Sequence, residues 1–364
     1  ARVRVDDGAG LEVRRGGAAA ETGEGGATGG APFMLHDAAG GEALCAVEFV
    51  RAHGWTAVRT SDGLTPFEAG VEQLGDMLVV NVAPGCEYFR VSGDDGASLR
   101  CSFCAYGRFD KRSLALGQEG GRNALPAATP ARLAEVLRAA VAGGGEAHHV
   151  YLTGGSLLSP AEEAERFLPL VEAVRAAVGD RLRVTVGSGA VDPQDSRRYR
   201  DAGADSACYN LETWDAATFR AACPGKHRYV GRERWIDGLL GAVEVFGRGN
   251  VGSAFVAGLE LRPPAPGMTA PQMIESILEG AGFLLDRGVV PLYSPLWPVD
   301  GTAYGPRDGI TPEQYLTLER AVYGLRAARR FPVPGWLICP GCSYMLLEVD
   351  FDRAFGLSAS QEGA

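Results

Sequence analysis

The sequence has no run of about 18 uninterrupted apolar residues, the length that a membrane-spanning helix needs. Its N-terminus lacks the charged head and apolar core of a secretory signal. Basic residues are also few, with 35 Lys and Arg against 45 Asp and Glu and a net charge of −10. So acidic a chain has no general attraction for nucleic acid or anionic lipid. We therefore expect a cytoplasmic protein with neither a membrane nor a nucleic acid as partner.

What the chain does have is a core and cysteines. Apolar residues make up 46% of 364 positions, enough for a sizeable globular core. Eight cysteines without a secretory signal favour metal or redox chemistry over a disulfide framework. Residues 1–31 contain 16 Gly or Ala and few large apolar side chains, so we expect a mobile tail there. Residues 32–76 are interpreted as an N-terminal extension or cap.

Short β-type segments then alternate with amphipathic helical ones. The strands are expected at 77–82, 148–153, 183–187, 205–211, 251–258 and 290–295. Capping residues precede proline at Thr129, Ser159, Asp192 and Thr311, which marks helix starts between the strands and after the last one. This alternation predicts an α/β fold, a full or partial TIM-type (β/α) barrel of parallel strands over 77–310. Residues 311–364 would complete or cover it, and a flat doubly wound sheet is the alternative.

The strongest chemical motif is a set of three cysteines directly after the first barrel strand. Fourteen residues separate Cys86 from Cys101, and two separate Cys101 from Cys104. Three thiolates could bind three irons of a [4Fe–4S] cluster and leave the fourth iron open. A structural zinc site, which normally needs four closed ligands, is the other interpretation.

Small and polar residues follow the next strands. Thr153-Gly154-Gly155-Ser156 ends the second strand, and glycines there let a ligand approach the backbone, although a plain turn is common for such a pair. Ser188 lies among small residues after the third strand. After the fourth, strand alternation puts Asn210 and Glu212 on one side, as binding of a ribose diol requires. A solvated Glu212 is the simpler alternative.

Together these motifs resemble the radical S-adenosylmethionine (SAM) superfamily over about residues 77–310. Within it the chain is most similar to the biotin-synthase-like branch, through 210–212, Arg234-Trp235, 257–260 and 298–302. Biotin synthase itself does not fit, because strands two and five lack the cysteines of its second cluster. The wide spacing after Cys86 also departs from the usual pattern, and we interpret residues 91–98, mostly turn formers, as an extruded loop.

The resemblance implies a function for each motif. Cys86, Cys101 and Cys104 would ligate the cluster, whose open iron SAM chelates. The backbone at 153–155 would receive the SAM amino group, and Asn210 and Glu212 the ribose. The remaining cofactor contacts would be Arg234 to the carboxylate, Tyr106 and Val256 to the adenine, and the neighbouring Phe103, Ser156 and Ser188. Ser156 stands where the family usually has an acidic residue after the two glycines, so at this position the sequence departs from the usual side-chain contact to the amino group.

A second cysteine pair, Cys339 and Cys342, follows a late apolar run. Four interpretations stay open: two ligands of an auxiliary iron–sulfur cluster that Cys45 or Cys223 would complete, a hydrogen-donating thiol, a redox dithiol, or a tight turn. We enter both as candidate catalytic residues.

The sequence thus predicts a radical SAM enzyme that abstracts hydrogen from a small molecule, with rearrangement, epimerisation, dehydrogenation or bond cleavage as the outcome. The implied cofactors are a [4Fe–4S] cluster and SAM, and the implied partner is a one-electron reductant of flavodoxin or ferredoxin type. The alternative is a zinc- or cluster-stabilised binding protein with a degenerate barrel and no SAM chemistry.

Overall fold

The computed structural model describes residues 11–15, 33–37, 41–47, 53–83, 85–104, 127–143, 147–296, 298, 301–305, 308–331 and 351. The contacts divide the chain into two units, Ala1–His53 and Gly54–Ala364. No helix in the described ranges is long and apolar enough to cross a membrane.

The first unit contains a small antiparallel sheet. Its strands lie in the order β1 (Leu11–Arg15), β2 (Phe33–Asp37) and β3 (Ala43–Val47). Strand β1 lies within residues 1–31, where we expected a mobile tail. A strand forms there because its alternating apolar and charged residues can pair with β2. Leu35 in the central strand is buried.

The second unit is built on a seven-stranded sheet in the order β10-β9-β8-β7-β6-β5-β4. Its strands are β4 (Val71–Leu74), β5 (Met77–Asn81), β6 (His149–Thr153), β7 (Arg183–Gly187), β8 (Ser206–Cys208), β9 (Val251–Ala257) and β10 (Val289–Pro295). All neighbouring pairs from β5 to β10 are parallel, and only β4 runs antiparallel, against β5. The six predicted strands are therefore confirmed, in a partial barrel whose edge strands β4 and β10 do not pair with each other.

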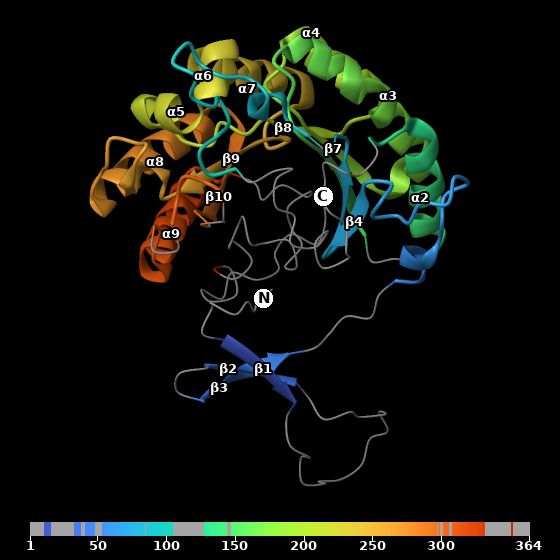
Figure 1. Ribbon diagram of the computed structural model, residues 1–364, viewed down its shortest axis with the longest axis horizontal. Coiled ribbons are helices and arrows are strands. Elements are labelled where there is room, and N and C mark those ends of the chain that lie inside the picture. The colour runs from blue at the N-terminus through green and yellow to red at the C-terminus, as the bar shows by residue number, and fades with distance from the viewer. Residues whose placement is uncertain are drawn as a thin grey trace. The chain divides into compact units, whose positions relative to one another are not determined.

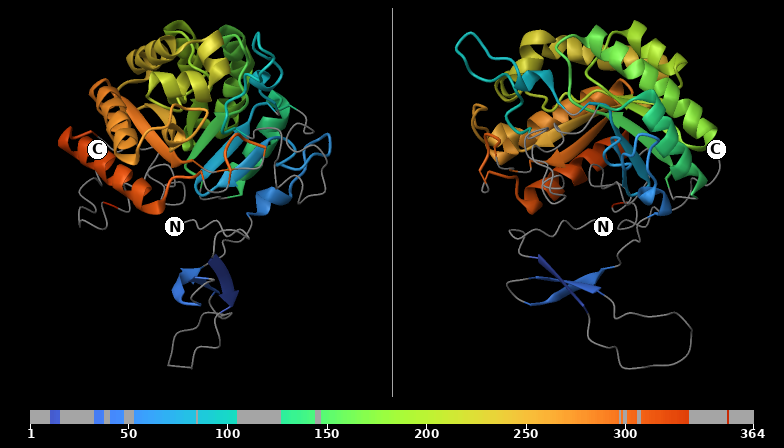
Figure 2. Two further views of the ribbon diagram at one scale, coloured as in Figure 1. Left: turned by 60° about the vertical axis from the view of Figure 1, so that its left-hand side comes forward. Right: turned by 45° about the vertical axis from the view of Figure 1, so that its right-hand side comes forward.

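Helices cover the outer face of this curved sheet (Figure 1, Figure 2). They are α2 (Pro130–Ala142), α3 (Pro160–Val178), α4 (Pro193–Asp201), α5 (Ala216–Ala222), α6 (Pro224–Tyr229), α7 (Arg232–Phe246), α8 (Ala270–Asp286) and α9 (Pro312–Ala328). Short 3₁₀ turns are η1 (Gly54–Ala57), η2 (Glu87–Phe89), η4 (Gly179–Arg181) and η5 (Leu259–Leu261). Apolar side chains such as Leu152, Val184 and Val186 are fully buried, as in parallel sheets covered by helices.

The predicted helix starts are confirmed, with differences in the caps. The Thr129 side chain accepts the first-turn amide of α2, and Thr269 and Thr311 form complete capping boxes. Ser159 accepts a backbone amide of α3. Asp192 precedes α4 without a side-chain cap hydrogen bond, because its carboxylate pairs with an arginine of α7 instead.

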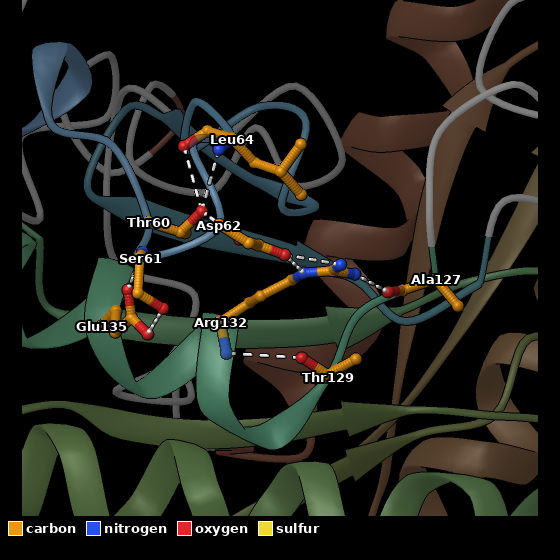
Figure 3. A network of polar contacts seen from close by, with 8 residues as sticks. All are labelled: Thr60, Ser61, Asp62, Leu64, Ala127, Thr129, Arg132 and Glu135. Carbon is orange, nitrogen blue, oxygen red and sulfur yellow. Dashed lines mark hydrogen bonds and ion pairs between the residues drawn. The ribbon is translucent and has the colours of Figure 1, made fainter.

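The stretch before the barrel is fastened to helix α2 by polar contacts (Figure 3). Arg132 donates from Nε to Asp62 Oδ2 at 2.8 Å. Glu135, one turn later on α2, accepts the backbone amide of Ser61 at 2.6 Å and its hydroxyl at 2.8 Å. Thr60 in turn donates to Asp62 at 2.6 Å. The turn that leads into β4 and β5 is thus held against the helix between β5 and β6.

Candidate active site

The carboxyl ends of the parallel strands gather the motifs at one edge of the sheet. Asn81 at the end of β5 pairs with Thr153 of β6, which pairs with Gly187 of β7. Glu212, after β8, forms an isolated parallel bridge with Phe255 of β9. The cysteine segment, the glycine pair and the 210–212 segment therefore share the edge at which (β/α) barrels place their chemistry.

Cys86 lies against the loop that follows β6. Its thiol receives hydrogen bonds from the backbone amides of Tyr88 and Ser156, while burial raises its pKa to about 11. A Cβ atom on Gly155 would lie 2.2 Å from the carbonyl oxygen of Gly85, closer than atoms can pack. We expected the glycine pair to let a ligand approach the backbone. In the structure it lets the protein's own cysteine segment approach the backbone closely.

Cys101 is buried against the junction of helices α5 and α6. It shares a hydrogen bond with Cys223, which together with burial raises the pKa of Cys101 far above its ordinary value. The backbone anchors the same contact, because Ser102 donates its amide to Ala222 O at 2.8 Å. Cys104 follows, with its amide donating to Cys101 O at 3.1 Å.

The three cysteines suit a cluster in number and kind. Each thiolate of an iron–sulfur cluster binds its own iron, so the ligands surround a body of several atoms. Cys86 and Cys101 lie within electrostatic range of each other at the same edge. In the described ranges, no three His, Cys, Asp or Glu side chains converge on a position for one metal ion.

The 210–212 segment is held by strand β9. Asn210 Oδ1 accepts the amide of Ala254 at 3.2 Å and the thiol of Cys208 at 3.3 Å. Glu212 donates its amide to Ala254 O at 3.0 Å and adopts a left-handed backbone conformation with φ 75°. Regular pairing with β9 stops after Cys208 and resumes only at Glu212, which bridges Phe255, so β8 ends at Cys208 and is shorter than the predicted strand.

Lys226 on α6 is a residue of this site that the sequence argument missed. Its side chain is buried, and Nζ lies 2.6 Å from Glu212 Oε1 and 2.7 Å from Asn210 O. Nζ also lies 4.4 Å from the centre of the Trp235 ring, a cation–π contact. Burial alone would lower the pKa of Lys226, but the Glu212 carboxylate and the nearby thiols raise it above its ordinary value.

Of the other predicted cofactor contacts, Val256 joins this group, because its amide donates to Glu212 O at 2.8 Å, whereas Arg234 makes its ion pair elsewhere. Arg234 is exposed and its guanidinium pairs with Asp192 at 3.2 Å, with no ion pair to Glu212. Ser188 is buried after β7, and Val256 and Phe103 are partly buried. The predicted Tyr106, Cys339 and Cys342 lie outside the described residues.

A segment from the far edge of the sheet reaches the cysteines. Arg100 donates to Gly301 O at 2.6 Å, and Ala303 donates its amide to Ser102 O at 2.8 Å. The hydroxyls of Ser102 and Tyr304 share a hydrogen bond of 3.1 Å. The chain after β10 therefore closes over the chain after β5, although strands β4 and β10 remain unpaired.

The described chain is thus an α/β fold, a partial (β/α) barrel with three cysteines after its first parallel strand. The family model "Radical SAM superfamily" matches residues 92–257. This match, over less than half of the chain, supports a member of the radical SAM superfamily and an enzyme of that class.

Relatives are distant. The bacteriochlorophyllide c C-7(1)-hydroxylase of Chlorobaculum limnaeum is 25% identical over 274 residues, 72% of this chain and 62% of the relative. The chain thus spans less than two thirds of that relative. Solved structures of methylornithine synthase (PylB) and of a radical SAM methyltransferase from Sphaerobacter thermophilus are 16% and 17% identical. Their TM-scores are both 0.46, with coverage of 72% and 75% of this chain and of 71% and 70% of theirs.

Proposed function

We propose that this enzyme reductively cleaves SAM at a [4Fe–4S] cluster held by Cys86, Cys101 and Cys104, and that hydrogen is then abstracted from a small-molecule substrate. When bound, the cluster supplies one electron to SAM, which yields methionine and the 5′-deoxyadenosyl radical. One observation carries the proposal: the cysteine segment lies between the two predicted SAM-binding segments. Cys86 contacts the loop after β6, and Cys101 contacts Cys223 at the start of α6, the helix whose Lys226 binds Glu212.

The chain's own residues would bind and orient SAM. The backbone at 153–155 would accept its amino group, and Asn210 and Glu212 would bind the ribose. Arg234 would need to exchange its exposed contact with Asp192 for the SAM carboxylate, which is an inexpensive change because exposed ion pairs contribute little. Tyr106 and Val256 would contact the adenine.

The finer assignments also belong to this proposal. We assign the chain to the biotin-synthase-like branch, with a flavodoxin- or ferredoxin-type reductant in the cytoplasm. Cys339 and Cys342 would supply a hydrogen-donating thiol or two ligands of an auxiliary cluster. The relative's name describes hydroxylation at one carbon of a bacteriochlorophyllide, so C–H hydroxylation joins rearrangement, epimerisation, dehydrogenation and bond cleavage as outcomes to test, with tetrapyrroles in the substrate panel.

The first test is anaerobic reconstitution with iron and sulfide, followed by dithionite, SAM and an assay for 5′-deoxyadenosine. Wild-type protein should bind iron and form 5′-deoxyadenosine, with substrate candidates present where needed. The Cys86→Ala, Cys101→Ala, Cys104→Ala triple variant should do neither. Cys208→Ala, which removes a buried thiol from β8, should keep its iron. Zinc in place of iron, with no binding of SAM, would overturn the proposal in favour of the binding-protein alternative.

The cysteine pair has its own test. Cys339→Ala should lose product while it still cleaves SAM if the thiol is a donor or an auxiliary ligand. Unchanged product would contradict both roles.

A further inference from the structure

Glu212 has a left-handed backbone conformation, which is unusual for a residue other than glycine. It is one of two non-glycine residues with positive φ in the described ranges, at 75°. For a residue with a side chain this backbone conformation costs free energy, and it persists only when the surrounding structure fixes it. Two hydrogen bonds to β9 do so, from Glu212 N to Ala254 O at 3.0 Å and from Val256 N to Glu212 O at 2.8 Å.

The carboxylate of Glu212 is fixed from the other direction by Lys226. The ammonium contacts Glu212 Oε1 at 2.6 Å, the carbonyl of Asn210 at 2.7 Å and the ring of Trp235 at 4.4 Å. The side chains of both charged residues are largely buried, with 8% and 13% exposed. The second oxygen, Glu212 Oε2, accepts no hydrogen bond from the described part of the chain.

We propose that Lys226 is a positioning residue, which orients the Glu212 carboxylate so that Oε2 receives the hydroxyls of the SAM ribose. This inference rests on the proposed function. An ionised carboxylate accepts up to about four hydrogen bonds. Lys226 occupies one oxygen and leaves the other for a diol.

Stability alone does not account for this pair. Burying an ammonium and a carboxylate costs about as much as their attraction returns, so buried ion pairs are often neutral for folding. Pre-organisation does account for it, because a carboxylate already desolvated and oriented spends less binding free energy on ordering when the ligand arrives.

The test is the affinity of reconstituted protein for SAM and for its 2′,3′-dideoxyribose analogue, measured by equilibrium dialysis. Wild-type protein should prefer SAM. Lys226→Met should bind SAM at least tenfold more weakly and bind the analogue as wild type does, so that the preference disappears. Iron content, measured separately, should stay unchanged.

A matched control removes the same kind of contact elsewhere. Arg175 also pairs with one carboxylate, Asp205, and donates to a backbone carbonyl, Gly203 O, at 2.9 Å. It lies at the opposite edge of the sheet, before β7 and β8. Arg175→Met should lower thermal stability and keep the preference for SAM over the analogue.

A double-mutant cycle makes the inference independent of one variant's folding. The Lys226→Met, Glu212→Gln double variant removes both charges of the pair and should bind SAM and the analogue as Glu212→Gln alone does. A Lys226→Met variant that keeps the wild-type preference would overturn the inference, as would a further loss of SAM affinity in the double variant. Wild-type protein that binds no SAM would instead overturn the proposed function.

Discussion

The carboxylate of Glu163 accepts the backbone amide of Gly189 at 2.6 Å and that of Leu157 at 2.9 Å. One buried side chain of α3 thereby joins the loop after β6 to the loop after β7. Burial raises the pKa of Glu163, an effect that both amides and the nearby Arg166 oppose. The two loops include predicted SAM-binding residues, so Glu163 fixes the distance between them.

Glu163→Gln should therefore destabilise the protein by about 2 kcal/mol, the range for a hydrogen bond to a charged group. Glutamine has one acceptor oxygen, and its amide nitrogen would face a second backbone N–H. Urea unfolding measures the loss, and the dissociation constant for SAM should rise. Glu165→Gln, at an exposed position of the same helix, should change stability by at most about 0.5 kcal/mol. Equal effects of the two substitutions would contradict this role.

Gly155→Ala should reduce the iron bound after reconstitution. Its Cβ would lie 2.2 Å from Gly85 O and 2.6 Å from the Cα of Cys86, and backbone cannot move aside as a flexible side chain can. The matched change is Gly324→Ala on α9, where a Cβ meets nothing within 4 Å. That variant should keep its iron and gain up to about 1 kcal/mol of stability, because alanine favours a helix. Full iron in Gly155→Ala would show that the contact is dispensable.

Glu260, directly after β9, should make folding stability depend on pH. Burial raises its pKa to about 7 from the ordinary value of 4.5, even though the Thr213 hydroxyl, 2.7 Å from Oε1, opposes the rise. The other oxygen, Oε2, is buried and has no hydrogen-bond partner in the described ranges. The folded state therefore holds this proton more tightly than the unfolded state does.

The sign follows from proton linkage. The stabilisation is fully present below pH 4.5 and is lost as the pH rises through about 7, a change on the order of 3 kcal/mol. Urea unfolding between pH 5 and 8 should show this decline in wild type and not in Glu260→Gln. Thr213→Val, which removes the opposing hydroxyl, should move the decline to higher pH. A decline of the same size in Glu260→Gln would assign it to other groups.

The sequence was sufficient for regular elements and insufficient for residues that act through tertiary contacts. Strands β5, β6 and β7 and the cap at Thr311 depend on local patterns, so they could be predicted. Strand β4 could not, because its pairing with β5 is set by a turn that α2 holds in place. Lys226 and Glu163 carry no local signal, since each acquires its partners only when two strand-end loops meet.

The segment between the first two cysteines shows how a local argument can still succeed at the site. Residues 91–98 were expected to form an extruded loop, and this is confirmed: Ser92 pairs antiparallel with Ser98, and Gly93 donates its amide to Ala97 O at 2.8 Å. Residues 94–98 are exposed. At the base, the amide of Leu99 donates to Val91 O at 3.1 Å.

Replacing residues 93–97 with Asn-Gly should therefore leave iron content and SAM cleavage unchanged. Asn-Gly supplies the two-residue turn that an antiparallel pair such as Ser92 and Ser98 needs. The deletion also removes the ion pair of Asp94 with Arg228, which is exposed and contributes little. Leu99→Ala is the contrasting change, because it removes a buried side chain at the base of the hairpin, and it should cost about 2–5 kcal/mol of stability. Iron lost from the shortened protein would mean that the hairpin itself shapes the cysteine site.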